Sequence, residues 1–331
     1  MPRLQVEKLS VTRPAAGGSV SVLSNVSFNL QAGEMVGLVG ESGSGKSMTL
    51  MSILGLNPVR GATISGSIRF DGNQLLGAPP RLLRSLRGRS LAMIFQDPGS
   101  ALNARLTIGE QIGEVFRIHR QVLSASERRA RILHLLEEVR FADAQTAVDS
   151  YPHELSGGMQ QRALIAMALA LQPKLLLADE PTTALDVTIQ AQIMDILRRI
   201  NVDYGSSILL VTHDIALAAS LCDRILVMYA GEIVEEGPAR EIVRHPAHPY
   251  TAGLLSCLPV IGQHRPPLPI RGEVPHAHPV SAVGCRFAER CPLVQDACRS
   301  ANVEYVTAAT GHLARCLRVE SATGTPASGD G

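Results

Sequence analysis

One short segment, residues 40–47, constrains the fold of this chain more than any other feature. It has the sequence Gly-Glu-Ser-Gly-Ser-Gly-Lys-Ser, and it directly follows the apolar run at residues 35–39. Residues 48–54 after it have a composition suited to a helix. A short apolar run suits a buried strand, and glycine permits the tight turn that must join it to a helix. The segment therefore predicts one strand–turn–helix unit of an α/β sheet.

The same turn has the chemistry of a phosphate-binding loop. Its glycines allow backbone N–H groups to point at phosphate oxygens, and the helix N-terminus adds partial positive charge. In this pattern Lys46 is expected to reach the β- and γ-phosphates, and the Ser47 hydroxyl to bind Mg²⁺. A flexible glycine loop with an incidental lysine is the alternative, and it leaves the flanking strand and helix unexplained. The expected nucleotide-binding residues here are Gly40, Glu41, Ser42, Gly43, Ser44, Gly45, Lys46, Ser47 and Met48.

Two acidic residues supply the second half of such a site. Asp179 and Glu180 follow the apolar run Leu-Leu-Leu-Ala at residues 175–178. The carboxyl ends of parallel strands are where α/β sheets bind ligands. We therefore expect Asp179 to hold the metal ion and Glu180 to polarise the attacking water. Two solvated acids at a strand end would be the simpler interpretation if the loop upstream were absent.

The arrangement of strands and helices predicts an α/β fold with a smaller region after it. Apolar runs suited to strands occur at residues 22–30, 35–39, 175–178, 208–212 and 225–229, separated by helical stretches. This alternation within residues 1–240 favours a mostly parallel sheet covered by helices. Residues 96–165 are charged and helical in character, which suggests a helical insertion. Proline-rich sequence begins near residue 245, so we expect a small irregular domain at 241–320 and a flexible tail at 321–331.

The composition excludes several other classes of protein. The 31 basic and 30 acidic side chains leave a net charge of +1, which argues against a broad basic surface for nucleic acid. A hydrophobic share of 45% argues against disorder. No apolar run approaches the roughly 20 residues of a membrane-spanning helix, and the N-terminus lacks a secretory signal. We therefore expect a chain that stays in the cytosol, where thiols are reduced.

Residues 155–160, Leu-Ser-Gly-Gly-Met-Gln, resemble the signature of the ATP-binding cassette (ABC) ATPases. Gln96, Asp186 and His213 are similar to the Q-loop glutamine, the D-loop aspartate and the switch histidine of that family. The resemblance implies a P-loop fold with a RecA-like core, an antiparallel β edge subdomain and a helical signature subdomain. It also implies ATP as the substrate and Mg²⁺ as the cofactor.

The resemblance further implies that two cassettes together form each ATP site. In this family two cassettes close head to tail around two ATP molecules, so the signature of one faces the γ-phosphate bound by the other. Glu180 would be the general base, Gln96 would contact Mg²⁺ together with Ser47 and Asp179, and His213 would contact the γ-phosphate. The signature residues are Leu155, Ser156, Gly157, Gly158 and Gln160.

The chain departs from the family near its N-terminus. The family usually places an aromatic residue there to stack on adenine, whereas residues 10–14 are Ser-Val-Thr-Arg-Pro. The planar guanidinium of Arg13 could stack on the base instead. A solvated surface arginine is the alternative.

Residues 248–255 and 284–292 look like the extension found in oligopeptide and dipeptide importer ATPases. This resemblance implies a subunit that powers peptide import from the cytoplasmic face of the cell membrane. The implied partners are a second, related ATPase subunit, two membrane permease subunits and an extracytoplasmic solute-binding protein, with no nucleic acid. Nickel, glutathione or another peptide-like solute is the alternative cargo. A soluble ABC ATPase acting on ribosomes or DNA usually has two cassettes or a long coiled-coil insertion, which this sequence lacks.

Four cysteines fall within that extension: Cys285, Cys291, Cys298 and Cys316. Four thiolates in a reduced compartment can bind zinc or an iron–sulfur cluster. The intervals of five, six and seventeen residues contain no C-x-x-C pair, so zinc-ribbon spacing does not fit. The resemblance implies a [4Fe–4S] cluster, and cysteines that pack a small domain without metal are the alternative.

Overall fold

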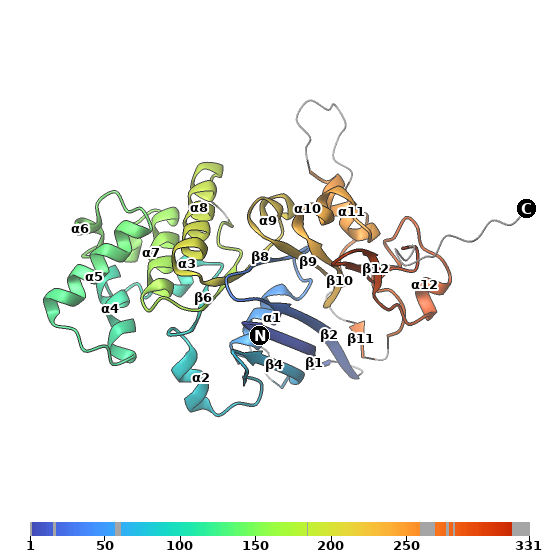
Figure 1. The fold of residues 1–331 in the computed structure, drawn as a ribbon, viewed down its shortest axis with the longest axis horizontal. Coiled ribbons are helices and arrows are strands. Elements are labelled where there is room, and N and C mark those ends of the chain that lie inside the picture. Colours follow the sequence, from blue (N-terminus) through green and yellow to red (C-terminus); the bar gives the residue numbers. More distant parts are fainter. Residues whose placement is uncertain are drawn as a thin grey trace, which may run out of the picture.

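The computed structural model describes residues 2–15, 18–56, 61–183, 185–258, 269–275, 278–280 and 282–319. Two β-sheets occupy the middle of the molecule, with a group of helices at one end and the region after residue 240 at the other (Figure 1). The predicted flexible tail, 321–331, lies outside the described residues.

The larger sheet has eight strands in the order β12-β13-β10-β9-β3-β8-β7-β6. Its five strands from β9 to β6 run parallel, and the other three are antiparallel. The strands are β3 (Met35–Val39), β6 (Leu91–Ile94), β7 (Leu175–Asp179), β8 (Ser207–Thr212), β9 (Arg224–Tyr229), β10 (Glu232–Pro238), β12 (Val306–Ala309) and β13 (His312–Ala314). The strands predicted near residues 35, 175, 208 and 225 are therefore all present.

The parallel strands read as continuous apolar runs because both of their faces are covered. In β3, Val36 and Leu38 pack into one core while Met35 and Val39 pack into the other. The first core also contains side chains of helix α1 (Lys46–Ile53) and of the smaller sheet. The second contains side chains of the large helices on the opposite face. Apolar residues at every position are the expected pattern for a doubly covered parallel sheet.

The smaller sheet is antiparallel throughout, with the order β11-β2-β1-β4-β5. Its strands are β1 (Leu4–Ala15), β2 (Gly18–Leu30), β4 (Thr63–Phe70), β5 (Asn73–Gln74) and β11 (His278–Pro279). Only β2 was predicted as a strand from the sequence. In β1, Leu4 and Val6 reach the core, as do Leu9 and Val11, but the register irregularities between Val6 and Val11 break the simple period of two.

The residues between β6 and β7 form the group of helices on the left of Figure 1. They comprise α3 (Pro98–Ala101), α4 (Ile108–Ile118), α5 (Ala125–Glu138), α6 (Ala144–Ala147), the 3-10 turn Pro152–Glu154 and α7 (Gly157–Leu169). Thr107 with Glu110, and Ser124 with Glu127, form capping boxes that fix where α4 and α5 begin. A helical insertion in this part of the chain was predicted. The helices α2 (Pro80–Leu86), α8 (Val187–Tyr204) and α9 (Ile215–Leu221) lie outside it.

The region after residue 240 joins both sheets. It contains α10 (Ala239–Arg244), α11 (Pro249–Ser256), α12 (Ala297–Ser300) and the strands β11, β12 and β13. β11 pairs with β2 and β13 pairs with β10, so segments far apart in the sequence lie side by side. Tyr250 and Phe287 belong to the same core as the parallel strands. The domain boundary near residue 240 stays a prediction, because the cores on its two sides are continuous.

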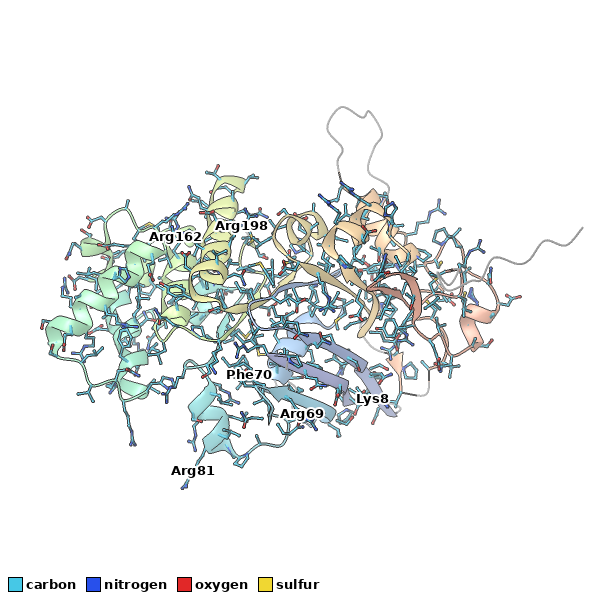
Figure 2. The ribbon with its side chains drawn as sticks, in the orientation of Figure 1. Lys8, Arg69, Phe70, Arg81, Arg162 and Arg198 are labelled. Atoms are coloured by element: carbon cyan, nitrogen blue, oxygen red, sulfur yellow. The ribbon has the colours of Figure 1, made fainter. Side chains whose placement is uncertain are left out.

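Surface arginines extend from several helices (Figure 2). Arg81 on α2 is exposed and points away from the ribbon. Arg87, by contrast, donates hydrogen bonds to the backbone oxygens of Leu54 and Gly55 and so holds the end of α1. Among the helices of the described residues, none is long and apolar enough to cross a membrane.

Candidate active site

The loop between β3 and α1 needs glycine at two positions. Gly45 is the N-cap of α1 and has φ of 106°, a left-handed conformation that a side chain would strain. At Gly40, a Cβ atom would lie 2.1 Å from the carbonyl oxygen of Met228 in β9. The loop therefore packs directly against the sheet, and it presents backbone N–H groups and the N-terminus of α1 to the space above the strand ends.

Lys46, the first residue of α1, bends back over this loop. Its Nζ donates hydrogen bonds to the carbonyl oxygens of Gly40 at 2.8 Å and Glu41 at 2.9 Å, and lies 3.8 Å from the Glu180 carboxylate. Burial lowers the pKa of Lys46, and the carboxylates of Glu180, Asp179 and Glu41 oppose that shift. The ammonium group is thus a buried cation held by oxygen atoms that incoming phosphate oxygens can replace.

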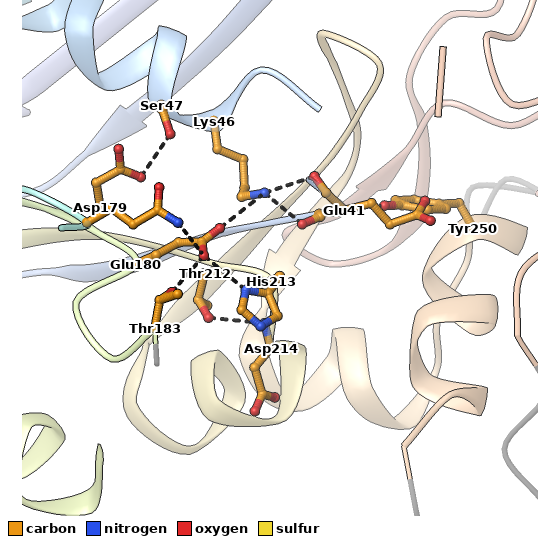
Figure 3. Close-up of polar contacts among 12 residues, drawn as sticks. Glu41, Lys46, Ser47, Asp179, Glu180, Thr183, Thr212, His213, Asp214 and Tyr250 are labelled. Atoms are coloured by element: carbon orange, nitrogen blue, oxygen red, sulfur yellow. Dashed lines mark hydrogen bonds and ion pairs between the residues drawn. The ribbon is translucent and has the colours of Figure 1, made fainter. Parts of the chain in front are cut away.

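Ser47 and Asp179 meet beside the lysine (Figure 3). The Ser47 hydroxyl donates a hydrogen bond to Asp179 Oδ1 at 3.0 Å. Burial raises the pKa of Asp179, while the Ser47 hydroxyl counteracts this by stabilising the carboxylate. A hydroxyl and a carboxylate side by side are oxygen ligands of the kind that Mg²⁺ prefers. The side chains present therefore fit the cation that the sequence predicts here.

Glu180 is the centre of the second polar cluster. Three side chains approach its Oε2 atom: Gln96 Nε2 at 3.3 Å, Thr183 Oγ1 at 2.9 Å and His213 Nδ1 at 3.1 Å. Its backbone has φ of 43°, a left-handed conformation that is costly for a residue with a side chain. The N–H of Glu180 donates to the carbonyl oxygen of Val211 at 2.9 Å, which ties this strained turn to β8.

These two clusters share one cavity of about 850 Å³. It joins the phosphate loop with Gln96, Glu180 and His213, which come from three different strand ends. Its remaining walls are apolar or belong to the C-terminal region: Val22, Leu254, Cys257, Pro269 and Ile270. The cavity thus has a polar end built for phosphates and a less polar end contributed partly by α11.

The structure leaves some predicted residues outside this cavity. Arg13 lies in β1 opposite Val20 and is not among the lining residues. Ser156 is exposed and caps α7 by accepting a hydrogen bond from the Met159 N–H. Asp186 caps α8 in the same way, through the N–H of Ile189. One copy of the chain therefore does not bring its signature and D-loop to its own phosphate loop.

The remaining signature residues support the start of α7. The side-chain amide of Gln160 donates to the carbonyl oxygens of Pro152 at 2.9 Å and Leu155 at 3.2 Å. Leu155 is buried, whereas Gly157 is exposed and Gly158 is partly exposed. This helix N-terminus consequently presents free backbone to the surface, in a form suited to an anion.

The iron–sulfur prediction is not supported by the geometry of the cysteines. Cys285, Cys291, Cys298 and Cys316 line one cavity, but its volume is about 20 Å³, room for about one water molecule. Within the described ranges, no group of three or more His, Cys, Asp or Glu side chains is arranged to hold a metal ion. Burial raises the pKa of Cys285 to about 11, which keeps this thiol protonated. The four cysteines form no disulfide, so here they pack as thiols.

Three residues that contact Glu180 or the phosphate loop were missed by the sequence analysis. Thr183 donates to Glu180, Tyr250 accepts from the Glu41 backbone, and Arg290 bonds the Glu41 carboxylate. Thr183 stands only three residues after Glu180, so its position could have drawn attention. Tyr250 and Arg290 stand in the two segments that resemble the importer extension, but they are more than 200 residues from Glu41 and no local pattern links them to the phosphate loop.

A second cavity, of about 560 Å³, lies between the core sheet and the helical region. Its lining is mostly apolar and includes Leu56, Met93, Phe95 and Leu164. Phe95 directly precedes Gln96 and is 36% exposed. A groove open to solvent with exposed apolar side chains is typical of a surface that meets another protein.

Comparison with known proteins agrees with this geometry. The ABC transporter family profile matches residues 23–183, and the profile of the oligopeptide/dipeptide transporter C-terminal region matches residues 234–298. A provisionally assigned peptide import ATP-binding protein of Brucella abortus is 47% identical over 90% of this chain and 89% of its own length. The oligopeptide transport ATP-binding protein OppD of Salmonella typhimurium is 43% identical over 90% of this chain and 88% of its own length.

Solved structures of ATP-binding cassettes are also similar to this chain. A dimeric ATP-binding cassette in a post-hydrolysis state, bound to ADP and Pi, is 32% identical with a TM-score of 0.64. The match covers 72% of this chain and 99% of that one. The cbiO1 protein of Clostridium perfringens, part of an ABC transporter complex, is 28% identical with a TM-score of 0.61, over 74% and 91% of the two chains. The chain therefore belongs to the ABC transporter family, as an ATPase of the group that carries the oligopeptide/dipeptide transporter C-terminal region.

Proposed function

We propose that this chain is the ATP-hydrolysing subunit of a peptide importer, bound peripherally to the cytoplasmic face of the cell membrane. The observation that carries the proposal is the single cavity in which Lys46, Ser47, Glu180 and His213 meet. The names of the relatives support peptides as the cargo, and none of the relatives named above is described as a nickel or glutathione importer.

In the proposed reaction, the phosphates of ATP lie along the phosphate loop. Lys46 exchanges the carbonyl oxygens of Gly40 and Glu41 for phosphate oxygens, so its charge offsets theirs. Ser47, Asp179 and Gln96 would hold Mg²⁺, which supplies further positive charge to the phosphate oxygens when bound. The apolar end of the cavity, with Val22 and Leu254, receives the base, and Arg13 stacks on it only if its side chain moves into the cavity.

Glu180 is the proposed general base. A water molecule gives its proton to the Glu180 carboxylate while its oxygen attacks the γ-phosphorus in line with the leaving group. The bond from the γ-phosphorus to the bridging oxygen breaks, and its electron pair stays on ADP. Gln96, Thr183 and His213 orient the carboxylate through hydrogen bonds to Oε2, and His213, which lines the same cavity, would also contact the γ-phosphate.

A second cassette completes the proposed site. Ser156, Gly157 and Gly158 of one chain would face the γ-phosphate bound by the other, with Asp186 at the interface. Exposure of this helix N-terminus and its distance from its own phosphate loop support that arrangement. We propose a related chain as the second cassette, and two permease subunits that dock at the groove around Phe95 and connect to a solute-binding protein outside.

Uptake of a labelled peptide tests this function. Cells that express the wild-type chain with its permease should accumulate the peptide, and cells that express Lys46→Ala should not. Fractionation of the same cells should place the chain with the membrane only when the permease is present. Ribosome association that does not depend on a permease would contradict the proposal.

The finer hypothesis concerns the four cysteines. The convergence of the four thiols on one cavity is the observation from which this hypothesis starts, and the volume of that cavity, about 20 Å³, argues against it. Anaerobic purification followed by an absorption spectrum and by iron, sulfide and zinc analysis distinguishes the two. A colourless protein without metal would leave the cysteines as packing residues, and the importer proposal would stand.

A further inference from the structure

Glu41, the second residue of the phosphate loop, is bonded at every one of its polar groups. Figure 3 shows it beside Lys46 and Tyr250. Its carbonyl oxygen accepts a hydrogen bond from Lys46 Nζ at 2.9 Å. Its backbone N–H donates to the Tyr250 hydroxyl at 2.9 Å. Its carboxylate accepts two hydrogen bonds from the Arg290 guanidinium, at 2.8 and 3.0 Å. The region after residue 240 therefore supplies two of the four partners, and the others are Lys46 and the Ser44 N–H, which also donates to the Glu41 carbonyl oxygen at 3.2 Å.

Arg290 is itself held rigidly. Its Nε donates to the carbonyl oxygen of Arg271 at 2.8 Å, and Nη2 donates to that of Gly272 at 3.1 Å. The guanidinium carbon lies 5.6 Å from the centre of the Tyr229 ring, and the side chain is 5% exposed. A two-pronged pair between a fixed guanidinium and a carboxylate defines the position of the carboxylate as well as stabilising it.

Tyr250 is equally well fixed. Its ring is fully buried and packs edge-on against Tyr229, with ring centres 4.7 Å apart. Phe287 packs against both rings. Burial and the nearby Glu41 carboxylate raise the pKa of Tyr250, so its hydroxyl stays protonated and neutral. The oxygen that holds the Glu41 N–H is therefore placed by the aromatic core rather than by a mobile side chain.

We propose that Arg290 and Tyr250 are positioning residues of the nucleotide site. They hold Glu41 in place, so the phosphate loop and the Lys46 ammonium are prearranged for phosphate before nucleotide binds. Nucleotide affinity then depends on the C-terminal region, which lies outside the matched ABC transporter profile. This inference rests on the proposed nucleotide-binding function and adds residues that the family motifs do not include.

The competing explanation is that Arg290 and Glu41 influence nucleotide affinity only through their charges. Removing each charge in turn distinguishes this explanation from positioning. Arg290→Met leaves the Glu41 carboxylate unpaired beside the polyphosphate, so both explanations predict weaker binding. Glu41→Gln instead leaves the Arg290 cation unpaired near the phosphates. Electrostatics alone predicts tighter binding for that variant, whereas positioning predicts weaker binding because the two-pronged contact is lost.

The experiment is calorimetric titration of the full chain with Mg²⁺ and ADP. We expect Arg290→Met and Glu41→Gln each to weaken ADP binding by about tenfold, the worth of one good charge-assisted contact. The double variant should be no weaker than either single one, because both remove the same contact. Tyr250→Phe should show a smaller loss. Arg299→Met is the matched control, since Arg299 pairs with exposed Glu289 at 3.5 Å, away from the loop.

Each outcome has a defined meaning. Unchanged ADP affinity in both Arg290→Met and Glu41→Gln, or tighter binding by Glu41→Gln, would overturn the proposal. If Arg290→Met fails to fold, Glu41→Gln alone decides, because it leaves the C-terminal region intact. If the wild-type chain binds no ADP, the proposed function itself fails, and this is distinguishable from a wild type that binds while the variants match it.

Discussion

At the residue scale, Glu180 combines a left-handed backbone with three side-chain hydrogen-bond partners and an ion pair to Lys46. The left-handed backbone at φ of 43° points the carboxylate into the cavity, where Gln96, Thr183 and His213 approach the same oxygen. Strain of this kind persists only where surrounding contacts enforce it. The geometry thus supports a role for this carboxylate in the reaction rather than in folding.

Glu180→Gln should separate ATP binding from hydrolysis. The amide keeps the shape and hydrogen-bonding capacity of the side chain but cannot accept the proton of water, so hydrolysis should fall by about 10²–10⁴-fold. ATP binding should persist, and closed dimers should accumulate. Single-turnover hydrolysis and size-exclusion chromatography with ATP measure the two effects. Ordinary turnover by this variant would remove Glu180 from the role of general base.

His248 makes the stability of the chain depend on pH. It is buried and caps α11 by accepting the Tyr250 N–H on Nδ1, so it must be neutral there. Burial lowers its pKa to about 4, against the favourable charge of Glu235. Between pH 6.5 and 4 the unfolded chain therefore binds more protons than the folded chain, and the free energy of unfolding decreases as the pH falls.

Because of His248, the free energy of unfolding should decrease by about 2 kcal/mol between pH 7.5 and pH 5. Urea unfolding at the two pH values measures it. His248→Asn keeps a capping oxygen without a titrating ring, so it should be less stable than the wild type at pH 7.5 but should lose about 2 kcal/mol less on acidification. Equal pH slopes for the two proteins would contradict this assignment.

At the scale of elements, the sequence predicted those strands and loops that a local pattern of residues determines. The buried parallel strands β3, β7, β8 and β9 were identified because both of their faces are apolar, and the phosphate loop because its residues are contiguous. β1 and β4 were missed, since irregular register interrupts the alternation of β1 and Gly66 interrupts β4. The short strands β12 and β13 carry too few residues for any period to show.

The same limit explains which site residues could be predicted. Lys46, Ser47, Asp179 and Glu180 stand in short motifs, and the structure brings them together. Tyr250 and Arg290, by contrast, come from distant segments that reach Glu41 only in the folded chain. The lack of support for the iron–sulfur prediction has the same origin, because spacing along the chain does not report how closely the four cysteines pack.

Helix α11 allows a prediction about the base. Leu254 lines the apolar end of the nucleotide cavity, whereas its neighbour Leu255 does not. Leu254→Ala should weaken ATP and GTP binding alike by about fivefold, since it removes roughly 1 kcal/mol of apolar contact without a polar partner for either base. Leu255→Ala is the control on the same helix. Equal affinities for the two variants would place the base elsewhere.

At the scale of the whole molecule, the groove around Phe95, where we propose that a permease subunit docks, adjoins the nucleotide cavity at Gln96. Phe95 directly precedes Gln96, which contacts Glu180. A partner that shifts Phe95 would therefore also shift Gln96, one peptide unit away. Phe95→Asp should abolish co-fractionation with the permease and leave ADP affinity unchanged, because a charge in an apolar contact is costly. Ile118→Asp, at an exposed residue outside the groove, is the control. Loss of membrane association in both variants would contradict the docking site.

The strands after residue 240 have one more consequence for the molecule. β11 pairs with Val20 and Ser21 on the outer edge of β2, and β13 pairs with Glu235 and Glu236 on the outer edge of β10. A shortened chain ending at residue 240 would keep the phosphate loop but would expose unpaired backbone N–H and C=O groups along two strands. Bare strand edges recruit strands from other molecules. The C-terminal region therefore also keeps these strand edges from pairing with other molecules, and a cassette truncated at residue 240 would lack this protection.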